Sequence, residues 1–241
     1  MSLYSNTLDL STEGADFIRH LPLFKPLNQQ ALCQVAEYMQ KRAFAPGVIL
    51  FHQDMPGMML YIIESGWIRL FSLGRTGQEL TLSILGPGDI CGELSTMDNK
   101  YHAATAITLA PAVMWLLPRN ELDNLLDRYP AVTRAMAQIL VARIRATINH
   151  AEAMTFQDVL GRLAYEILYL ADRHGEPDRE EIAIQVPLTQ ADLASMVGAT
   201  RESVNKALAT LRSQELVKMI DSRLVVMHVP GLRQILNERG R

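Results

Sequence analysis

Residues 187–217 contain the most restrictive pattern in the chain, two helix signals separated by a turn of three residues. Thr189 precedes the first helix with Asp192 three residues later, a pair similar to a capping box in which Asp replaces the usual Glu. The first helix is expected to end at Gly198, because glycine adopts the left-handed conformation after a helix without a steric cost. Thr200 can then cap a second helix. Capped helix, glycine turn and capped helix, in this order, predict a helix-turn-helix.

The second of these helices has one apolar face, expected to point inward, and one polar face. Near the N-terminus of the polar face, where a recognition helix meets base edges in the major groove, lie Arg201, Glu202, Asn205 and Lys206. Arginine can bond guanine at two atoms and glutamate can accept from cytosine, so these residue types favour DNA over a merely solvated helical hairpin. Ser203 suits phosphate contacts. Thr189 and Thr200 complete the DNA-binding set that we predict.

The charge distribution and the segment that follows agree with a DNA-reading C-terminal end. Residues 1–130 carry 9 Lys and Arg against 13 Asp and Glu, whereas residues 188–241 carry 8 against 5, on a chain of net charge −3. A basic C-terminal segment on an acidic protein is a modest signature of nucleic-acid binding. The pattern of Leu216–Val226 is typical of a small hairpin with its turn at residues 221–223, which would be the wing of a winged helix-turn-helix.

The segment from Arg42 to Leu117 has a different pattern, in which short β-rich runs are separated by turns containing Gly and Pro. The runs are Val48–Phe51, Leu60–Ile63, Trp67–Ser72, Leu80–Leu85, Ala103–Leu109 and Val113–Leu117. Short strands at nearly regular spacing predict a sandwich or barrel instead of a parallel sheet. We expect no segment of helix length to interrupt these strands.

Helical patterns flank the β-rich segment. Before it we expect a short helical lead-in at Phe17–Phe24 and an amphipathic helix at Asn28–Met39, whose first residue is the N-cap. After it, Asn120–Asp127 predicts a helix that stops before Pro130, because the residue before proline resists the α conformation. Ala131–Met154 then predicts a long uninterrupted helix without Gly or Pro.

Along this long helix, residues at spacings of 4, 3, 4 and 3 define a heptad seam. The seam residues are Leu140, Ile144, Thr147, Ala151 and Met154. A two-stranded coiled coil buries such a seam against its own copy, so we expect the helix to dimerise the chain. The alternative is a long helix packed on its own domain. Thr155–Asp158 is expected to be a hinge, followed by a helix at Val159–Asp172 and a polar loop at residues 174–179.

Together these segments resemble the CRP/FNR family of bacterial transcription regulators, from about Phe17 to the end of the chain. The matching motifs are PG (46–47), LYIIESGWIRL (60–70), LGPGDICGEL (85–94), FQDVLGRLA (156–164) and TRESVNKAL (200–208). The resemblance implies an α+β fold with an N-terminal jelly-roll-like β-roll, a long dimerisation helix and a C-terminal winged helix-turn-helix. The implied domains are an effector-sensing, cyclic-nucleotide-binding-like β-roll at 17–130, a dimerisation helix and hinge at 131–156, and a DNA-binding domain at 157–241.

The resemblance also implies partners. Family members bind a two-fold-symmetric operator in double-stranded DNA as homodimers, and a small-molecule effector in the β-roll repositions the DNA-binding domains. An Arg-Glu-x-x-x-Arg pattern on the recognition helix reads TGTGA-like half-sites. Arg201 and Glu202 match this pattern, while Lys206 at the last position offers a point charge instead of a planar fork. Residues 172–181 correspond to a common contact surface for RNA polymerase.

The identity of the effector is left open by the resemblance. Cyclic-nucleotide sensors follow Gly-Glu-Leu with Arg-Ser-Ala, and use the glutamate for the ribose 2′-hydroxyl and the arginine for the cyclic phosphate. The residues at matching positions here are Gly92, Glu93, Leu94, Lys100, Tyr101, His102, Ala103 and Thr147. The arginine is missing, which would cost a bound phosphate a strong charge-assisted bond unless Lys100 turns inward. We therefore keep cAMP, 2-oxoglutarate (suggested by the Tyr-His-Ala run) and no effector at all as alternatives.

Other classes of function have weaker signals. Cys91, His102 and His52 could be imagined as haem ligands, but a lone cysteine before Gly-Glu-Leu is more often a buried apolar residue. The 6 histidines are scattered, so we predict no catalytic residue, no metal ligand and no enzyme. A cyclic-nucleotide-binding module that regulates a protein partner is the alternative of another class. Without a signal-peptide pattern or an apolar run long enough for a bilayer, we expect a cytoplasmic protein with no membrane partner.

Overall fold

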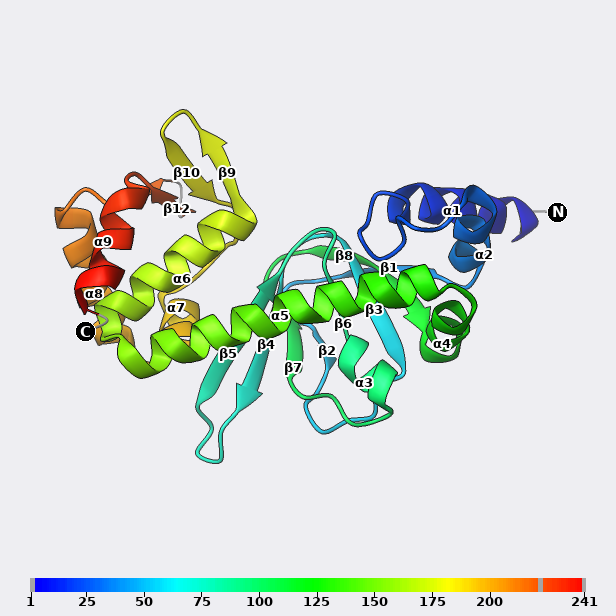
Figure 1. The fold of residues 1–241 in the computed structure, drawn as a ribbon, viewed down its shortest axis with the longest axis horizontal. Coiled ribbons are helices and arrows are strands. Elements are labelled where there is room, and N and C mark those ends of the chain that lie inside the picture. Colours follow the sequence, from blue (N-terminus) through cyan, green and yellow to red (C-terminus); the bar gives the residue numbers. More distant parts are fainter. Residues whose placement is uncertain (1–2, 221–222, 240–241) are drawn as a thin grey trace. The chain divides into compact units, whose positions relative to one another are not determined.

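The computed structural model describes residues 3–220 and 223–239, and for residues 3–10 and 239 it describes the backbone alone. The chain divides into two compact units, residues 1–72 with 83–144 and residues 73–82 with 145–241, which we treat separately. The boundary at residues 144–145 falls within α5 (Pro130–Phe156), which Figure 1 shows as one uninterrupted helix. The mixture of sheets, long helix and helix-turn-helix confirms the expected α+β class. The three-part domain division made from the sequence stays a prediction.

Two four-stranded antiparallel sheets form the β-roll. One sheet has the order β1 (Gln40–Phe44), β8 (Ala112–Pro118), β3 (Met59–Ser65) and β6 (Ile90–Cys91). The other has the order β2 (Ile49–Phe51), β7 (Thr105–Thr108), β4 (Ile68–Leu73) and β5 (Glu79–Leu85). Both sheets contribute to one apolar core, which includes the buried side chains of Ile63, Ile68, Cys91, Ala106 and Met114. The expected sandwich is thus confirmed.

Helices of the first unit pack around Trp115 of β8. These helices are α1 (Leu3–Ile18), α2 (Gln29–Glu37), α4 (Arg119–Arg128) and the first part of α5, whose buried side chains share one core with Trp115. The short helix α3 (Glu93–Asp98) follows β6 and contributes no described side chain to that core. The Trp115 indole is fully buried, and its Nε1–H donates to Glu64 at 2.5 Å. Phe17 stacks on the ring at 6.4 Å between centroids, and a Cβ added to Gly14 would lie 3.1 Å from it. The small residue therefore lets α1 approach the sheet closely.

Two expectations for the first unit are wrong, and two of its strands were not predicted. The lead-in at Phe17–Phe24 is not a helix, because α1 ends at Ile18 and residues 19–26 form turns that contain two prolines. The short helix α3 does interrupt the strands, although its six residues are too few to show a helical period. The sequence reading also omitted β1, whose side chains are mostly exposed, and β6, which has only two residues. By contrast, the N-cap Asn28 is confirmed, since its side chain accepts from the Ala31 N–H at 2.9 Å.

The second unit has a four-stranded sheet and four helices besides the end of α5, within the described residues. The helices are α6 (Val159–His174), α7 (Gln190–Val197), α8 (Arg201–Ser213) and α9 (Val229–Arg239). The sheet has the order β11 (Val217–Ile220), β12 (Arg223–Val226), β10 (Glu181–Ile184) and β9 (Gly175–Asp178). The wing strands are therefore present, while residues 221–222 of the expected turn lie outside the described residues.

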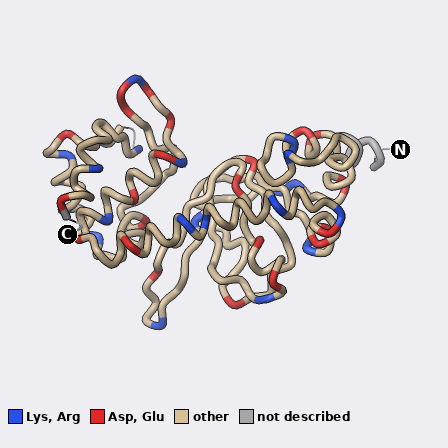
Figure 2. Tube along the Cα trace, in the orientation of Figure 1, with Lys and Arg blue, Asp and Glu red and all other residues tan. Residues whose placement is uncertain are grey.

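The polar loop expected at residues 174–179 is wrong, because Gly175–Asp178 is strand β9 and pairs with β10. Three of its four residues are exposed, so no apolar alternation marked the strand in the sequence. Figure 2 shows acidic and basic residues together at this hairpin. In the described part of the chain, none of the helices has the length and apolar character needed to cross a membrane.

Candidate DNA-binding and effector sites

The polar face of α8 is the candidate DNA-binding surface. The opposite face is packed inward, with Val204 and Leu211 completely buried and Leu208 2% exposed. The side chains predicted to face base edges are all exposed, and they are Arg201, Glu202, Asn205 and Lys206. None of these four side chains forms an ion pair or a hydrogen bond with another residue in the described ranges, 3–220 and 223–239. Their charges and amide are available to a ligand.

Two capped helix starts hold this surface. Thr189 and Asp192 form a complete capping box, with Thr189 Oγ1 accepting from the Asp192 N–H at 3.1 Å and Asp192 accepting from the Thr189 N–H at 2.8 Å. Gly198 ends α7 in the left-handed conformation, with φ of 61°. Thr200 then accepts from the Ser203 N–H at 3.2 Å. The helix-turn-helix geometry is confirmed, whereas contacts of these residues with DNA remain predictions.

The Gly-Glu-Leu motif forms the turn from β6 into α3. Gly92 has φ of 87°, and a Cβ there would lie 2.6 Å from the Met59 carbonyl oxygen, so the turn requires glycine. The turn buries Glu93, which is 3% exposed, and leaves Leu94 50% exposed. A carboxylate buried this deeply is stable only when it is paired.

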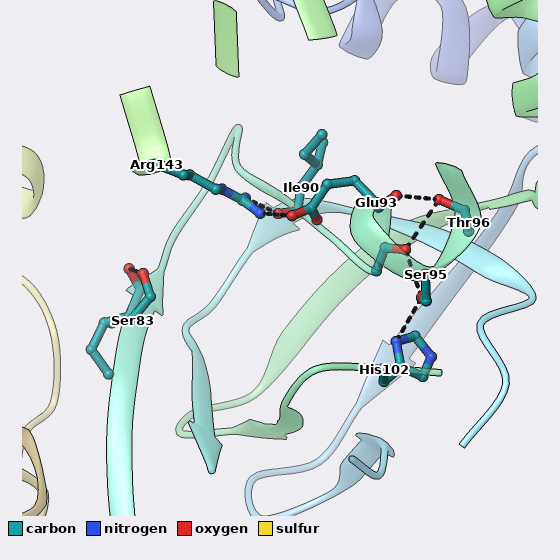
Figure 3. Close-up of polar contacts among 9 residues, drawn as sticks. Ser83, Ile90, Glu93, Ser95, Thr96, His102 and Arg143 are labelled. Carbon is teal, nitrogen blue, oxygen red and sulfur yellow. Dashed lines mark hydrogen bonds and ion pairs between the residues drawn. The ribbon is translucent and has the colours of Figure 1, made fainter. Parts of the chain in front are cut away.

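Arg143 of α5 is the partner of Glu93. Its guanidinium donates to the Glu93 carboxylate and to the Ile90 carbonyl oxygen, as Figure 3 shows. The sequence reading missed Arg143, because it lies 50 residues from Glu93 on a helix expected only to dimerise. A usable signal was present: Arg143 is four residues before Thr147, and residues spaced by four share one face of a helix.

His102 forms a second buried polar contact beneath α3. Its Nδ1 lies 2.9 Å from Ser95 Oγ, and the Ser95 hydroxyl donates to the Gly92 carbonyl oxygen at 3.1 Å (Figure 3). A hydroxyl has one hydrogen, so His102 Nδ1–H must donate to Ser95. The imidazole stacks on Phe51 at 3.8 Å between ring centroids. Burial lowers the pKa of His102, so this ring brings no positive charge to the site near neutral pH.

The remaining predicted effector residues lie outside this buried pair of contacts. The Lys100 side chain is 78% exposed and its Nζ lies 3.8 Å from the Asp98 carboxylate. Tyr101 is 65% exposed, and Ala103 is exposed as well. Thr147 is exposed on α5 in the second unit. Lys100 thus does not turn inward, and Arg143 is the cation that contacts the Gly-Glu-Leu motif.

Cys91 is a buried strand residue, as expected from the sequence. Its thiol is completely buried in β6, and this burial, together with the nearby charge of Glu93, raises its pKa well above the ordinary value. A protonated thiol is a poor metal ligand, because metals bind the thiolate. Over the residues with described positions, His, Cys, Asp and Glu side chains form no group of three or more that could hold a metal ion.

Comparison with known families gives two matches that together cover most of the chain. Residues 41–129 match the family model of the cyclic nucleotide-binding domain. Residues 161–235 match that of the Crp-like helix-turn-helix domain. The first match contains the buried Glu93 and His102, and the second contains the exposed face of α8.

Curated relatives align over most of the chain. The CRP-like cAMP-activated global transcriptional regulator of Mycobacterium tuberculosis is 33% identical over 187 residues, 78% of this chain and 84% of that protein. The cyclic AMP receptor protein of Thermus thermophilus is 29% identical over 214 residues, 89% of this chain and 96% of that protein. The structure of FixK2 from Bradyrhizobium japonicum has the same fold, with a TM-score of 0.74 at 19% identity over 82% of this chain and 96% of that one.

Proposed function

Because the chain belongs to the CRP/FNR family of transcription regulators, we propose that it binds palindromic DNA as a homodimer under the control of a small anionic effector. Like its relatives, it is a DNA-binding regulator and not an enzyme. The observation that carries the proposal is the exposed face of α8, whose charged side chains have no intramolecular partner among the described residues. A solvated surface helix commonly pairs such charges within itself, whereas a recognition helix presents them to DNA.

The proposed operator has TGTGA-like half-sites. Arg201 and Glu202 occupy the first turn of α8, where side chains reach base edges in the major groove. Arginine can bond guanine O6 and N7 together, and glutamate can accept from cytosine N4. Lys206 is one turn further along the same helix and supplies a point charge, so we expect weaker base discrimination at its position.

The proposed dimer forms along α5. Val141, Ile144 and Ile148 are 50%, 59% and 52% exposed, and their spacing of three and four places them on one face of the helix. This stripe differs from the seam read from the sequence, because Leu140 packs on the core of its own unit and Met154 lies against Gly198. Burying the stripe against its copy would remove three large apolar side chains from water.

A cyclic nucleotide is the proposed effector, with cAMP as the first candidate. The relatives from Mycobacterium tuberculosis and Thermus thermophilus carry cAMP in their names. Glu93 can accept from a ribose hydroxyl, and Arg143 can supply the positive charge that Lys100, turned to solvent, does not. We infer that a bound phosphate takes over part of the Arg143 guanidinium.

The remaining partner and the cellular compartment follow from the family assignment. The β9–β10 hairpin and the end of α6 present Asp172, Glu176, Asp178 and Glu180 as exposed charges, and we propose this surface for contact with RNA polymerase. A regulator that reads bacterial operators acts where the chromosome is, so we place the protein in the cytoplasm.

Fluorescence anisotropy of a labelled palindromic TGTGA duplex tests the proposal. The titration is run against a scrambled duplex, with and without cAMP, at one near-physiological salt concentration, because phosphate contacts make such affinities salt-dependent. We expect specific binding that tightens with cAMP and is lost in the variant Arg201→Glu with Glu202→Ala. Equal binding of both duplexes by the native protein, or unchanged binding by the variant, would contradict the DNA-reading role of α8. Specific binding that does not change with cAMP would instead favour 2-oxoglutarate as the effector, or a regulator without an effector.

Calorimetric titration with cAMP separates the two candidate cations. Arg143→Gln should weaken cAMP binding by roughly ten-fold or more, since it removes a charge-assisted bond worth about 1.5–3 kcal/mol. Lys100→Gln is the matched control and should change the affinity less than about two-fold, because exposed ion pairs contribute little. The reverse order of the two effects would show that Lys100 turns inward on binding.

A further inference from the structure

The end of α5 is attached to the DNA-binding part of the second unit by several side-chain contacts. Residues 145–156 of α5 belong to the same compact unit as α6 to α9. A Cβ added to Gly198, in the turn of the helix-turn-helix, would lie 2.7 Å from Met154 Cε. Gln157 Nε2 donates to the Leu236 carbonyl oxygen of α9 at 3.1 Å. The helix-turn-helix therefore contacts the end of α5, and α9 contacts Gln157 in the linker that follows it.

The most buried of these contacts joins His150 of α5 to Glu166 of α6. His150 Nδ1 lies 2.6 Å from Glu166 Oε1, and the two side chains are only 20% and 6% exposed. A carboxylate can only accept, so His150 Nδ1–H is the donor. Within the described part of the chain, His150 is the one side chain that hydrogen-bonds to Glu166. We refer to this contact as the hinge pair.

The surroundings of the hinge pair are aromatic. Tyr165 lies 6.4 Å from His150 between ring centroids and stacks on Tyr169, also at 6.4 Å. Burial, with a further effect of Glu166, raises the pKa of Tyr165 to about 12, so its phenol stays protonated near neutral pH. His150 Nε2 is buried without a hydrogen-bond partner among the described residues. The two side chains therefore meet through a single hydrogen bond, from one ring nitrogen to one carboxylate oxygen. This bond constrains the orientation of α5 relative to α6.

Stability alone is a poor explanation for such a pair. Taking a carboxylate out of water is costly, and well-packed apolar residues of similar volume often stabilise a protein as much or more. What a buried polar pair supplies better than apolar packing is one defined geometry, because a shift of either helix breaks the hydrogen bond.

We propose that the hinge pair is a positioning device, which fixes the direction of α6 relative to the end of α5 and thereby sets the separation of the two recognition helices in a dimer. The proposal rests on the proposed homodimer and adds to it a residue pair that determines operator spacing. In this role His150 and Glu166 need not touch DNA or effector. Loss of this hydrogen bond should leave each recognition helix intact. It should also allow the two recognition helices of a dimer to bind half-sites at altered spacing.

The test compares operators that differ only in half-site spacing. Affinities are measured by anisotropy for a palindrome whose half-site centres lie one helical turn apart, about 10 base pairs, for the same palindrome widened by two base pairs, and for a duplex with one half-site. Two inserted base pairs rotate the half-sites by about 70°, so a rigid dimer should lose roughly ten-fold or more in affinity. In the double variant His150→Leu with Glu166→Leu, we expect this preference to fall by at least roughly three-fold, with single half-site affinity and melting temperature retained.

A matched pair of single variants keeps the test independent of the double variant's folding. Asparagine places its amide nitrogen near the position of Nδ1, whereas glutamine places it near that of Nε2. His150→Asn should therefore keep the spacing preference, and His150→Gln should lose it. Unchanged spacing preference in His150→Gln, or a parallel loss of single half-site affinity, would overturn the positioning role. A native protein that binds one half-site as well as the palindrome would instead contradict the proposed dimeric function.

Discussion

At the scale of single residues, the geometry of the candidate effector site depends on which side chains the buried polar groups pair with. Glu93 is paired with Arg143, and His102 with Ser95, although the members of the first pair come from distant segments. Lys100 and Tyr101 directly precede His102 in sequence but are exposed, while His102 is buried. The chemistry of the site is therefore decided by side-chain direction as much as by residue type.

The buried imidazole of His102 predicts how the first unit responds to acid. Its pKa in the folded state is lowered by burial, so the folded state binds fewer protons than the unfolded one below about pH 6.5. The free energy of unfolding of the first unit should therefore be highest, as far as His102 affects it, above that pH. It should fall as the pH drops toward 5. His102→Asn, which keeps a donor for Ser95 but does not titrate, should flatten this dependence.

Urea unfolding at several pH values, followed by tryptophan fluorescence, measures this effect, since Trp67 and Trp115 both lie in the first unit. If the native protein and His102→Asn lose the same free energy of unfolding between pH 7 and 5, His102 is not the group responsible for the pH dependence.

At the scale of helices and strands, local signals identified the elements that have caps. The box at Thr189 and Asp192 and the N-caps Asn28 and Thr200 all appear where the sequence placed them. A cap is a contact within four residues, so its residue types are sufficient evidence. Short strands such as β9 and β6 are stabilised by neighbours across the sheet, and no local signal marks them.

The turn of the helix-turn-helix gives a prediction at this scale. Gly198 has φ of 61°, so Gly198→Ala should destabilise the second unit by about 1 kcal/mol, and Met154→Ala should not restore it, because the strain lies in the backbone. Gly198→Asn is the matched control and should cost less, since asparagine tolerates this conformation. Hydrogen exchange of amides in α7 and α8 reports the change. Full rescue by Met154→Ala would point to crowding of the Met154 side chain as the cause.

At the scale of the whole molecule, the exposed stripe on α5 has a consequence for assembly. Val141, Ile144 and Ile148 are large apolar side chains on one face of a helix of 27 residues, an arrangement that a single chain leaves in water. The family assignment and the stripe together support self-association along this helix.

Ile144→Glu is predicted to weaken the proposed dimer by at least about ten-fold, because two carboxylates would meet in an apolar seam. Light scattering on a size-exclusion column should then find a mass near 27.0 kDa instead of twice that value at low concentration. Asn149→Glu, which changes an exposed residue away from the stripe, is the control and should remain dimeric. A mass of 27.0 kDa for the native protein would show that it is a monomer. An undiminished dimer in Ile144→Glu would show that the interface lies elsewhere.

The class of fold, the order of its parts and the helix-turn-helix could all be predicted from the amino-acid sequence. Each of these is encoded locally, in hydrophobic periods, Gly and Pro turns and capping residues whose partners lie within a few positions. Three further features became visible only in the folded chain: the pairing of Arg143 with Glu93, the burial of His102 instead of Lys100, and the face of α5 that stays exposed. These outcomes depend on contacts between residues tens of positions apart. Side-chain direction and burial there are set by the packing of other segments, which the local sequence does not contain.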